Sequence, residues 1–475
     1  MSLPSSTIRK LRDIVGPAGI VNGKAGLKVY ECDGYTLERA EPELVVLPAS
    51  TEQVSKVVAF CHRNAIPFVP RGAGTGVSGG CLPAEIPVMI GTSRMRTIRN
   101  VDLANRTAEV EAGVVNLEVS RRVEADGFYY APDPSSQSAC TIGGNIAENS
   151  GGPHTLKYGV TVNHLLELEV VLPDGAVVRL DRRPGSVGYD LGGLITGSEG
   201  TLGIATAATV RLMVRPQGVA TLLAVFPNVP DASRAVSAIM SAGIIPAALE
   251  MMDALVIEAV EAAYSFGFPS DAGAVLIVEL DGMEAELEGA CRRVSEACRD
   301  AGAGEIRRAA DAAERELLWK SRKRAFGAMG RLAPSYCTQD GVVPPSRLPE
   351  AAERIAEIAD RYNLRIANLM HAGDGNIHPI ILYDDKDTEE VERVITAGRE
   401  ILTACVELGG SLTGEHGIGV EKIELMSTMF GSVEMEVMQS VRATFDARGL
   451  CNPGKILPMP GGCVEIKRPR PRGGG

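Results

Sequence analysis

Short runs of hydrophobic residues divide the first part of the chain, and the spacing of each run predicts its element. The run 44–47 (LVVL) is unbroken and typical of a short buried strand. Apolar residues then follow at positions 54, 57, 58 and 61, which share one face of a helix. Ser50 can cap this helix, with Gln53 as its capping-box partner. The next run, 66–70 (IPFVP), predicts a second strand that leads directly into a glycine-rich stretch.

Further patterns extend this first domain. The segment 166–180 (LELEVVLPDGAVVRL) predicts a hairpin around a Pro-Asp-Gly turn, and a helix is expected near 116–126. These mixed helices and short strands indicate an α+β domain over 41–216. The residues before it, 1–40, are expected to form a helical lead-in.

From about residue 217 the pattern changes to longer strands, each followed by a longer helical period. Strand-like runs at 221–226 and 274–282 precede such helices, and 365–383 predicts two strands joined by a tight turn. We therefore expect a second α+β domain over 217–457 that ends in helices. The remaining residues, 458–475, form a basic tail that we expect to be a solvated, disordered end.

The stretch 70–80 (PRGAGTGVSGG) contains the pattern G-x-G-x-x-G, which occurs in nicotinamide-binding Rossmann domains. That fold requires a helix directly after the glycines, but Pro83 and Pro87 and another strand pattern follow here. No Lys-Ser or Lys-Thr follows, so the stretch is not a Walker A loop either. Glycines leave backbone N–H groups unobstructed, and such a loop can hold a diphosphate without a helix. With two more glycine-rich loops at 140–152 and 197–204, it can enclose a long ligand such as FAD.

Composition and charge exclude several classes of function. A net charge of −12 and only 4% aromatic residues disfavour nucleic-acid binding. The N-terminus lacks the apolar core of a signal peptide, and no run of 18 apolar residues occurs, so a cytoplasmic location is expected. The ten cysteines include no C-x-x-C pair, which disfavours a disulfide framework, a structural zinc or an iron–sulfur cluster.

Three of the six histidines lie in two short motifs, HAGDGNIH and GEHGIG. The predicted turn at AGDG can bring His371 and His378 together. With Glu415 they make two imidazoles and one carboxylate, a usual ligand set for Zn²⁺, Mn²⁺ or Fe²⁺. His416 then lies beside this group, free to act as a base. The alternative is a polar pocket that holds no metal.

Several motifs carry a resemblance to a known family. PELVVLP, PFVPRGAGTGVSGG, APDPSS, TIGGNIAENSGG and GSEGTLGIAT resemble the FAD-binding domain of the vanillyl-alcohol oxidase and p-cresol methylhydroxylase superfamily. LWKSRK, HAGDGNIHP, GEHGIG and NPGK follow in the order found in the FAD-binding subunit of bacterial glycolate oxidase and in its D-lactate dehydrogenase relatives. The resemblance covers about 40–457. It implies an α+β fold with a two-subdomain FAD-binding domain, an α+β substrate domain, C-terminal helices and a last segment that returns toward the flavin.

The resemblance implies an FAD site built from the glycine-rich loops and their neighbours. The implied residues are Pro70, Arg71, Gly72, Ala73, Gly74, Thr75, Gly76, Ser78, Gly79, Pro132, Thr141, Gly143, Gly144, Asn145, Gly200, Thr201, Gly203, Ile204 and Asn452. Some members of the superfamily tether the flavin to histidine or cysteine. No histidine lies in 70–80 and Cys81 lies just beyond it, so we expect non-covalent FAD. His154 is expected to be structural rather than to approach the flavin.

In metal-containing relatives, the positions matching His371, His378 and Glu415 are metal ligands, the one matching His416 is the base, and the one matching Arg322 binds the substrate carboxylate. These roles suit oxidation of a 2-hydroxy acid. The hydroxyl proton must leave while the α-hydrogen passes as hydride to flavin N5. A metal lowers the hydroxyl pKa, a histidine takes the proton, and a guanidinium can hold a carboxylate through two bonds. The alternative for Arg322 is an ordinary surface arginine on a helix.

The expected substrate is a small D-2-hydroxy acid, glycolate or D-lactate, because Ile380 replaces a polar residue found two positions after the second histidine in relatives that act on dicarboxylic acids. The alternatives are a D-2-hydroxyglutarate-type dehydrogenase, a non-redox flavin enzyme and a non-catalytic flavin subunit that relays electrons. Electrons would pass to a quinone, a soluble carrier or an iron–sulfur partner. The resemblance favours a glycolate oxidase complex with a second flavin-type subunit and an iron–sulfur subunit, associated with a membrane only through partners.

Overall fold

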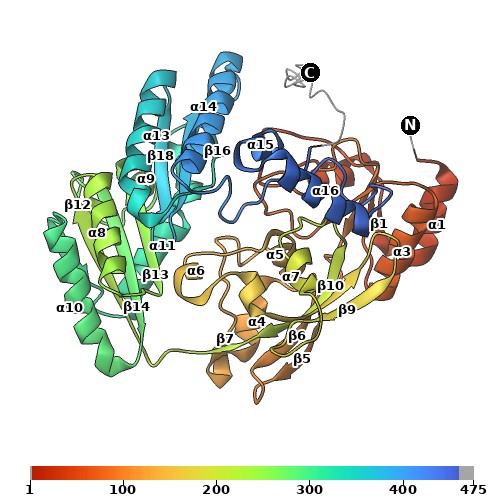
Figure 1. Ribbon diagram of the computed structural model, residues 1–475, viewed down its shortest axis with the longest axis horizontal. Coiled ribbons are helices and arrows are strands. Elements are labelled where there is room, and N and C mark those ends of the chain that lie inside the picture. The colour runs from red at the N-terminus through yellow and green to blue at the C-terminus, as the bar shows by residue number, and fades with distance from the viewer. Residues whose placement is uncertain (1–2, 459–475) are drawn as a thin grey trace.

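The computed structural model describes residues 3–458, and these form two lobes, with the chain first passing from one to the other near residue 216 (Figure 1). The N-terminal lobe comprises residues 3–214, and the C-terminal lobe comprises residues 218–425. A C-terminal segment, 426–458, returns to the N-terminal lobe and places helix α16 (Ser432–Phe445) over it. The predicted basic tail lies, from residue 459 onward, outside the described residues.

The first sheet of the N-terminal lobe has the order β1-β2-β4-β3. Its strands are β1 (Ile20–Val21), β2 (Leu44–Val46), β3 (Phe68–Arg71) and β4 (Val88–Gly91). The last three run parallel, whereas β1 pairs antiparallel with β2. The segment 1–40 is therefore not only helical as predicted. Helix α1 (Ser5–Val15) is followed by a strand, because two apolar residues complete the edge of this sheet.

Helix α3 (Thr51–Arg63) confirms the predicted apolar face, since all four of its predicted inward residues are fully buried. Its N-terminus differs slightly from the predicted capping box. Ser50 Oγ accepts a hydrogen bond from the Gln53 N–H, as expected. The Gln53 side chain, however, accepts from the N–H of Ala49 at 2.8 Å, one residue before the cap.

The second sheet of this lobe is antiparallel with the order β5-β6-β10-β8-β9. Its strands are β5 (Ile98–Asp102), β6 (Thr107–Glu111), β8 (Leu165–Val171), β9 (Val177–Asp181) and β10 (Ile204–Arg211). Strands β8 and β9 form the predicted hairpin. Strand β7 (Phe128–Tyr129) comes after helix α4 (Asn116–Val123) and pairs antiparallel with β11 (Met213–Val214). Strand β11 is the last strand before the chain passes to the C-terminal lobe.

The C-terminal lobe is built on one eight-stranded antiparallel sheet of order β15-β12-β14-β13-β18-β19-β16, with β17 beside β19. The strands are β12 (Gly218–Phe226), β13 (Ala248–Asp253), β14 (Ala274–Gly282), β15 (Glu305–Arg308), β16 (Ser335–Thr338), β17 (Gly341–Val342), β18 (Arg365–His371) and β19 (Asn376–Tyr383). Strands β18 and β19 are the predicted pair joined by a tight turn.

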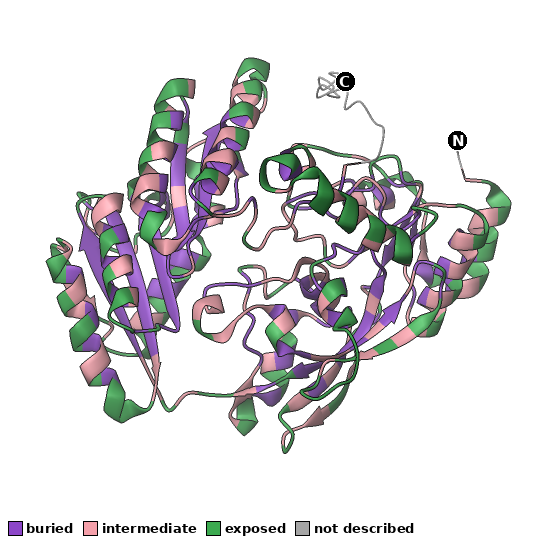
Figure 2. Ribbon diagram, viewed as in Figure 1, coloured by how far each residue is buried: buried purple, intermediate pink, exposed green. Residues whose placement is uncertain are grey.

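Helices cover both faces of this sheet, which explains why its central strands are buried throughout (Figure 2). One face packs on α8 (Val229–Ser241), α10 (Glu284–Asp300), α13 (Leu348–Tyr362) and α14 (Thr388–Glu407). The other packs on α9 (Ala254–Tyr264), α11 (Ala312–Lys323) and α12 (Ala325–Ala328). Met251 and Met252 point to opposite faces of the sheet, Met251 into the core with α8 and Met252 into the core with α9.

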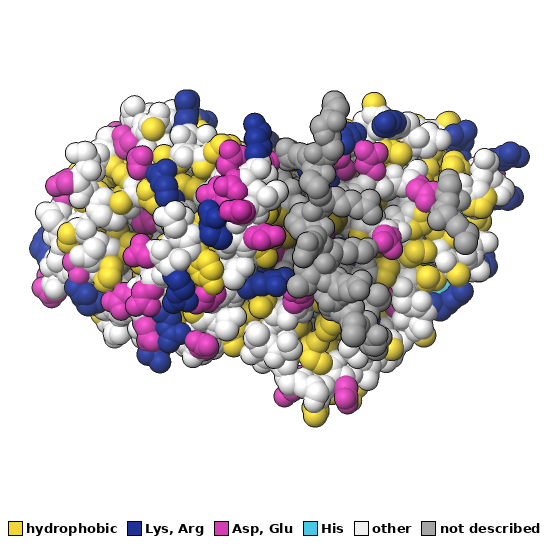
Figure 3. All heavy atoms as spheres, turned by 90° about the horizontal axis from the view of Figure 1, so that it is seen from above, with side chains coloured by type: hydrophobic (Ala, Val, Ile, Leu, Met, Phe, Trp, Pro, Cys, Tyr) yellow, Lys and Arg dark blue, Asp and Glu magenta, His cyan; other side chains and the backbone are white. Residues whose placement is uncertain are grey.

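The returning segment joins the first sheet directly. Phe68 donates its N–H to Leu450 O and accepts from Asn452 N–H, so residues 450–452 lie alongside β3. No helix among residues 3–458 is long and apolar enough to cross a membrane. Apart from the grey residues, the face in Figure 3 carries basic and acidic side chains intermixed, rather than one continuous basic surface.

Candidate functional site

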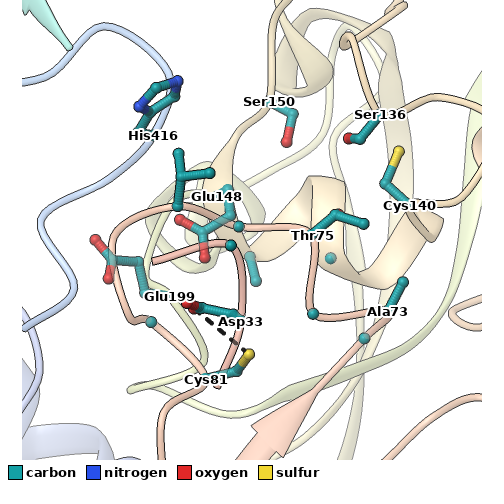
Figure 4. Close-up of a pocket in the computed structure, with 18 of the residues that line it drawn as sticks. Asp33, Ala73, Thr75, Cys81, Ser136, Cys140, Glu148, Ser150, Glu199 and His416 are labelled. Atoms are coloured by element: carbon teal, nitrogen blue, oxygen red, sulfur yellow. Dashed lines mark hydrogen bonds between the residues drawn. The ribbon is translucent and has the colours of Figure 1, made fainter. Parts of the chain in front are cut away.

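The glycine-rich stretch after β3 runs as an open loop, with no helix between residues 72 and 87, and so confirms that it is not a Rossmann turn. Gly74 has φ of 73°, a conformation that favours glycine. A Cβ on Gly72 would lie 2.7 Å from Thr141 Oγ1, so only glycine fits against the second glycine-rich segment. The loop forms one wall of a cavity of about 390 Å³ (Figure 4).

The second glycine-rich segment is a helix rather than the predicted loop. Thr141 caps α5 (Ile142–Glu148) by accepting the Gly144 N–H, and Asn149 ends the helix with φ of 55°. Two glycines disfavour a helix, but the burial of Ile142 and Ile146 in the lobe core outweighs that cost. The third segment, 197–203, is a loop before β10, as predicted.

Fourteen of the predicted FAD residues line the cavity. They are Pro70, Arg71, Gly72, Ala73, Gly74, Thr75, Gly76, Thr141, Gly143, Gly144, Asn145, Gly200, Gly203 and Ile204. Five others do not line it. These are Ser78, Gly79, Pro132, Thr201 and Asn452.

Three of the five bond to segments next to the cavity. Asn452 is fully buried and donates from Nδ2 to Gly80 O and Glu199 O, which ties the first and third glycine segments together. Ser78 O accepts the Val420 N–H, and Pro132 O accepts from Asn116 Nδ2. Sequence motifs do not distinguish residues that face a cavity from those that hold its wall.

The opposite wall comes from the C-terminal lobe, where the predicted turn brings two histidines together. In the β18–β19 register, His378 lies opposite Leu369 and therefore diagonal to His371. The two ring centres are 5.2 Å apart and nearly perpendicular. Glu415 Oε1 lies 3.2 Å from His371 Nε2 and 3.5 Å from His378 Nε2. These three ligand atoms lie within 4.8 Å of one another, close enough to share one ion.

The charges around this group favour a cation. His371 Nδ1 lies 2.7 Å from Glu250 Oε1. Burial alone would lower the pKa of His371, but the carboxylates of Glu250 and Glu415 outweigh burial and raise it to about 10. Burial opposes ionisation of Glu415 as well, yet hydrogen bonds from His371 and His378 hold its pKa well below the usual value. The group therefore attracts one positive charge, which can be a proton or a metal ion.

Arg322, the predicted substrate clamp, lies beside His371 and Glu250. It is 1% exposed and does not line the cavity. Its Nε donates to Glu250 Oε2 at 2.5 Å, and its Nη2 lies 3.4 Å from His371 Nδ1. The guanidinium is thus engaged behind His371, because a buried carboxylate from β13 competes for it. The alternative of an ordinary surface arginine is wrong, because Arg322 is buried.

Asp340, which follows β16, orders the segment that carries Glu415 and His416. Its Oδ2 accepts the N–H groups of Gly414, Glu415 and His416 at 2.9–3.2 Å. Its carboxylate also accepts from the Thr413 hydroxyl and lies 3.5 Å from Lys422 Nζ. Burial opposes its ionisation, but the charge of Lys422 and the hydrogen bond from Thr413 help to keep the pKa of Asp340 below the usual range.

His416 lines the cavity and stacks on His378, with ring centres 4.8 Å apart and planes within 7°. Burial lowers the pKa of His416 to about 4, and the attraction of Asp340 does not compensate. Its Nδ1 is buried without a hydrogen-bond partner among the described residues. His416 is therefore neutral at physiological pH and able to accept a proton.

Two carboxylates lie between the glycine loop and the His416 segment (Figure 4). Glu199 accepts hydrogen bonds from the N–H groups of Ile418 and Gly419, and burial raises its pKa to about 7. Burial and neighbouring Glu199 raise the pKa of Glu148 well above the usual value. At neutral pH this pair is therefore only partly ionised, which eases the crowding of two carboxylates.

Sequence reasoning missed Glu250, Asp340 and Glu199. Glu250 left a usable signal, because a single acidic residue interrupts the apolar strand 248–252 (ALEMM) and needs a buried partner. Asp340 and Glu199 left none, since each acts on backbone groups more than 70 residues away in the chain.

His154 lies outside the cavity and joins the two lobes. Its Nδ1 lies 2.8 Å from Asp133 Oδ2, and its Nε2 lies 3.2 Å from Glu279 Oε1 on β14. Glu279 also accepts from Arg315 and Trp319. Burial would lower the pKa of His154, but the two carboxylates outweigh it and raise it to about 10. The structural role predicted for His154 agrees with this placement.

The raised pKa of His154 makes its contribution to stability depend on pH. The contribution should be complete below about pH 6.5, the unfolded value, and lost as pH rises toward 10. We expect His154→Gln to lower the free energy of unfolding by about 1.5–3 kcal/mol at pH 6. Thermal midpoints of both proteins between pH 6 and 10 should converge with rising pH. A gap that does not change with pH would contradict this assignment.

Comparisons with known proteins agree with this architecture. Residues 42–181 match the family model described as an FAD binding domain, and residues 215–456 match that of FAD linked oxidases, C-terminal domain. The chain is 47% identical over 463 residues to the glycolate oxidase subunit GlcD of Escherichia coli (strain K12), covering 97% of this chain and 93% of that one.

A second relative carries a different name. The chain is 33% identical over 428 residues to a D-lactate dehydrogenase of Anaerostipes hadrus, covering 88% of this chain and 90% of that one. Among solved structures, p-cresol methylhydroxylase superposes with a TM-score of 0.80 at 19% identity, covering 95% and 96% of the two chains. The fold is thus of the p-cresol methylhydroxylase type, and the chain belongs to the FAD-linked oxidase family, as an oxidoreductase with an FAD-binding domain.

Proposed function

We propose that the chain oxidises a small D-2-hydroxy acid, glycolate or D-lactate, to the 2-keto acid. The observation that carries this proposal is that glycine-rich segments and a histidine-containing group line the same cavity. Glycine-rich segments of the N-terminal lobe form one wall, and His378, Glu415 and the neutral His416 form the other. An oxidation of this kind needs a flavin and a base in one place.

The cavity wall fits a non-covalent flavin. Backbone approaches that only glycine allows, at Gly72 and Gly74, leave room along the loop for a large ligand. Cys81, the cysteine just beyond the glycine loop, lines the cavity but is half-buried, and desolvation raises the pKa of its thiol to about 12. A thiol in this form is unreactive toward a flavin. Bound FAD would supply the hydride acceptor.

The donor set of His371, His378 and Glu415 fits Zn²⁺, Mn²⁺ or Fe²⁺. Such an ion would supply a Lewis acid for the substrate hydroxyl. Glu250 would fix His371 through Nδ1, and Arg322 would fix Glu250. His416, one residue from the ligand Glu415, would take the hydroxyl proton. To bind a substrate carboxylate as well, Arg322 would have to leave Glu250.

Ile380 does not support a small substrate. Ile380 is fully buried in the core between the sheet and α9, and it does not line the cavity. The proposal for glycolate or D-lactate therefore rests on the names of the relatives. A panel of glycolate, D-lactate, L-lactate and D-2-hydroxyglutarate with an artificial electron acceptor tests it. Turnover fastest with D-2-hydroxyglutarate would favour the dicarboxylate alternative.

We propose that electrons leave this chain to a quinone, a soluble carrier or an iron–sulfur partner. Among the described residues, no group of cysteines lies close enough to hold an iron–sulfur cluster. The relative from Escherichia coli is named as a subunit of glycolate oxidase. We propose that this chain also works with partner subunits, one of them carrying iron–sulfur clusters. A subunit that only relays electrons would need no base, so the position of His416 argues against that alternative.

We expect His371→Ala to reduce the metal content of the purified protein by at least about tenfold, because one of three ligands is lost. Elemental analysis after exhaustive buffer exchange measures this directly. His164→Ala, which removes a buried histidine outside the cavity, is the matched control. Wild-type protein that carries no stoichiometric metal would contradict the metal proposal.

A further inference from the structure

The segment Gly414–Gly419 (GEHGIG), which we call the base loop, has every one of its six backbone N–H groups bonded. Asp340 Oδ2 accepts the first three, those of Gly414, Glu415 and His416. Thr413 Oγ1 accepts the fourth, from Gly417 at 2.9 Å. Glu199 accepts the last two, from Ile418 at 2.6 Å and Gly419 at 2.7 Å.

The two carboxylates that hold the base loop come from different lobes. Asp340 follows β16 of the C-terminal lobe, whereas Glu199 precedes β10 of the N-terminal lobe. A second contact from the N-terminal lobe lies beside Glu199, because the Val420 N–H donates to Ser78 O at 3.0 Å. The base loop is thus fixed to the lobe that carries the glycine-rich wall, and not only to its own lobe.

Glu199 is held firmly in this place. It is 5% exposed and has φ of 50°, an unfavourable conformation for a residue other than glycine. Its N–H donates to Ala147 O, and its carbonyl accepts from Asn452 Nδ2. On the base loop, a Cβ at position 417 would lie 2.7 Å from Glu199 Oε1. The loop can therefore lie this close to Glu199 only because residue 417 is glycine. Hydrogen bonds on both sides of Glu199 stabilise the strained backbone.

We propose that Glu199 is a positioning residue that sets the base loop, and with it His416, in register with the flavin-binding wall across the lobe boundary. The kinetic part of this inference rests on the proposed oxidation. Two hydrogen bonds from adjacent N–H groups to the two oxygens of one carboxyl group fix both the distance and the orientation of the loop. Displacing a reacting group by about 1 Å can cost about 10²-fold in rate.

Glu199→Gln tests the inference, because glutamine keeps the size and the backbone conformation but has only one acceptor oxygen. The Ile418 N–H bonds to Oε1 and the Gly419 N–H to Oε2, so one of these two donors would face the NH₂ group of glutamine, which cannot accept. We expect the limiting rate of flavin reduction by glycolate or D-lactate to fall by about 10- to 100-fold. The half-saturating substrate concentration should change by less than about threefold, and bound FAD should stay stoichiometric.

Hydrogen exchange gives a readout that does not depend on turnover. In Glu199→Gln, the amides of Ile418 and Gly419 should exchange at least about tenfold faster, as measured by mass spectrometry on peptides spanning residues 413–422. The control is Glu279→Gln, which weakens a different contact between the lobes, to His154. This variant should lower the thermal midpoint but leave both the exchange of the base loop and the reduction rate within about twofold of wild type.

Unchanged exchange and an unchanged reduction rate in Glu199→Gln would overturn the inference. Equal effects in Glu279→Gln would also overturn it, since general docking of the lobes would then explain them. Failure of the proposed oxidation is distinguishable. In that case wild-type flavin would not be reduced by any hydroxy acid, while the faster exchange in Glu199→Gln would still report the contact.

Discussion

Replacing His416 by alanine should lower the rate of flavin reduction by a hydroxy acid about 10²- to 10⁴-fold while FAD stays bound. The imidazole lines the cavity next to Glu415, and burial keeps it neutral by lowering its pKa to about 4. His371 and His378, the neighbouring histidines, have their Nε2 atoms turned toward Glu415 and so do not replace it. Stopped-flow measurement of flavin absorbance under anaerobic conditions gives the rate.

The matched control for this variant is His62→Ala, which removes a histidine on α3 that does not line the cavity. The flavin bound to this variant should be reduced by the hydroxy acid at the wild-type rate. If His416→Ala loses FAD instead of rate, the histidine belongs to the cofactor site rather than to proton transfer. A wild-type rate in His416→Ala would contradict its role as base.

Replacing Gly76 by valine should weaken FAD binding about 10- to 100-fold without unfolding the protein. Gly76 lines the cavity, and its φ is not in the left-handed region. A Cβ there would lie 3.9 Å from Glu148 Oε1 and 4.0 Å from Asp33 Oδ2, with no nearer atom. The free protein thus accommodates a side chain at this position. Once FAD occupies the cavity, overpacking costs about 1–3 kcal/mol.

The FAD-to-protein ratio after gel filtration and a titration of the apoprotein with FAD measure this effect. Gly23→Val is the control, because a Cβ at Gly23 meets no atom within 4 Å and Gly23 does not line the cavity. It should bind FAD as the wild type does. Full FAD affinity in Gly76→Val would show that the cofactor does not pass this part of the loop.

Local sequence patterns were sufficient to predict much of the fold. The β18–β19 turn could be predicted because two apolar runs flank a short Ala-Gly-Asp-Gly turn, and that turn alone places His371 diagonal to His378. The missing helix after β3 could be predicted from Pro83 and Pro87. Helix α5 could not, because its two glycines indicate a loop and only the burial of Ile142 and Ile146 stabilises the helix.

The site was harder to predict, because long-range pairs decide which charges are free. Arg322 has the chemistry of a carboxylate clamp, but Glu250, 72 residues earlier, occupies its guanidinium. Ile380 follows His378 by two positions, yet it packs into the core and not against the cavity. Glu199 contacts backbone groups about 220 residues later, which no local pattern reveals.

Anaerobic mixing of the purified FAD-bound chain with glycolate or D-lactate tests the proposed oxidation most directly. Oxidised flavin absorbs visible light and loses this band when it accepts a hydride. We predict that the band bleaches with at least one of the two acids, with one equivalent of the 2-keto acid formed per flavin. L-lactate should bleach it more slowly than D-lactate. A flavin that stays oxidised with glycolate, with D-lactate and with D-2-hydroxyglutarate would contradict the assignment of this chain as a hydroxy-acid oxidoreductase.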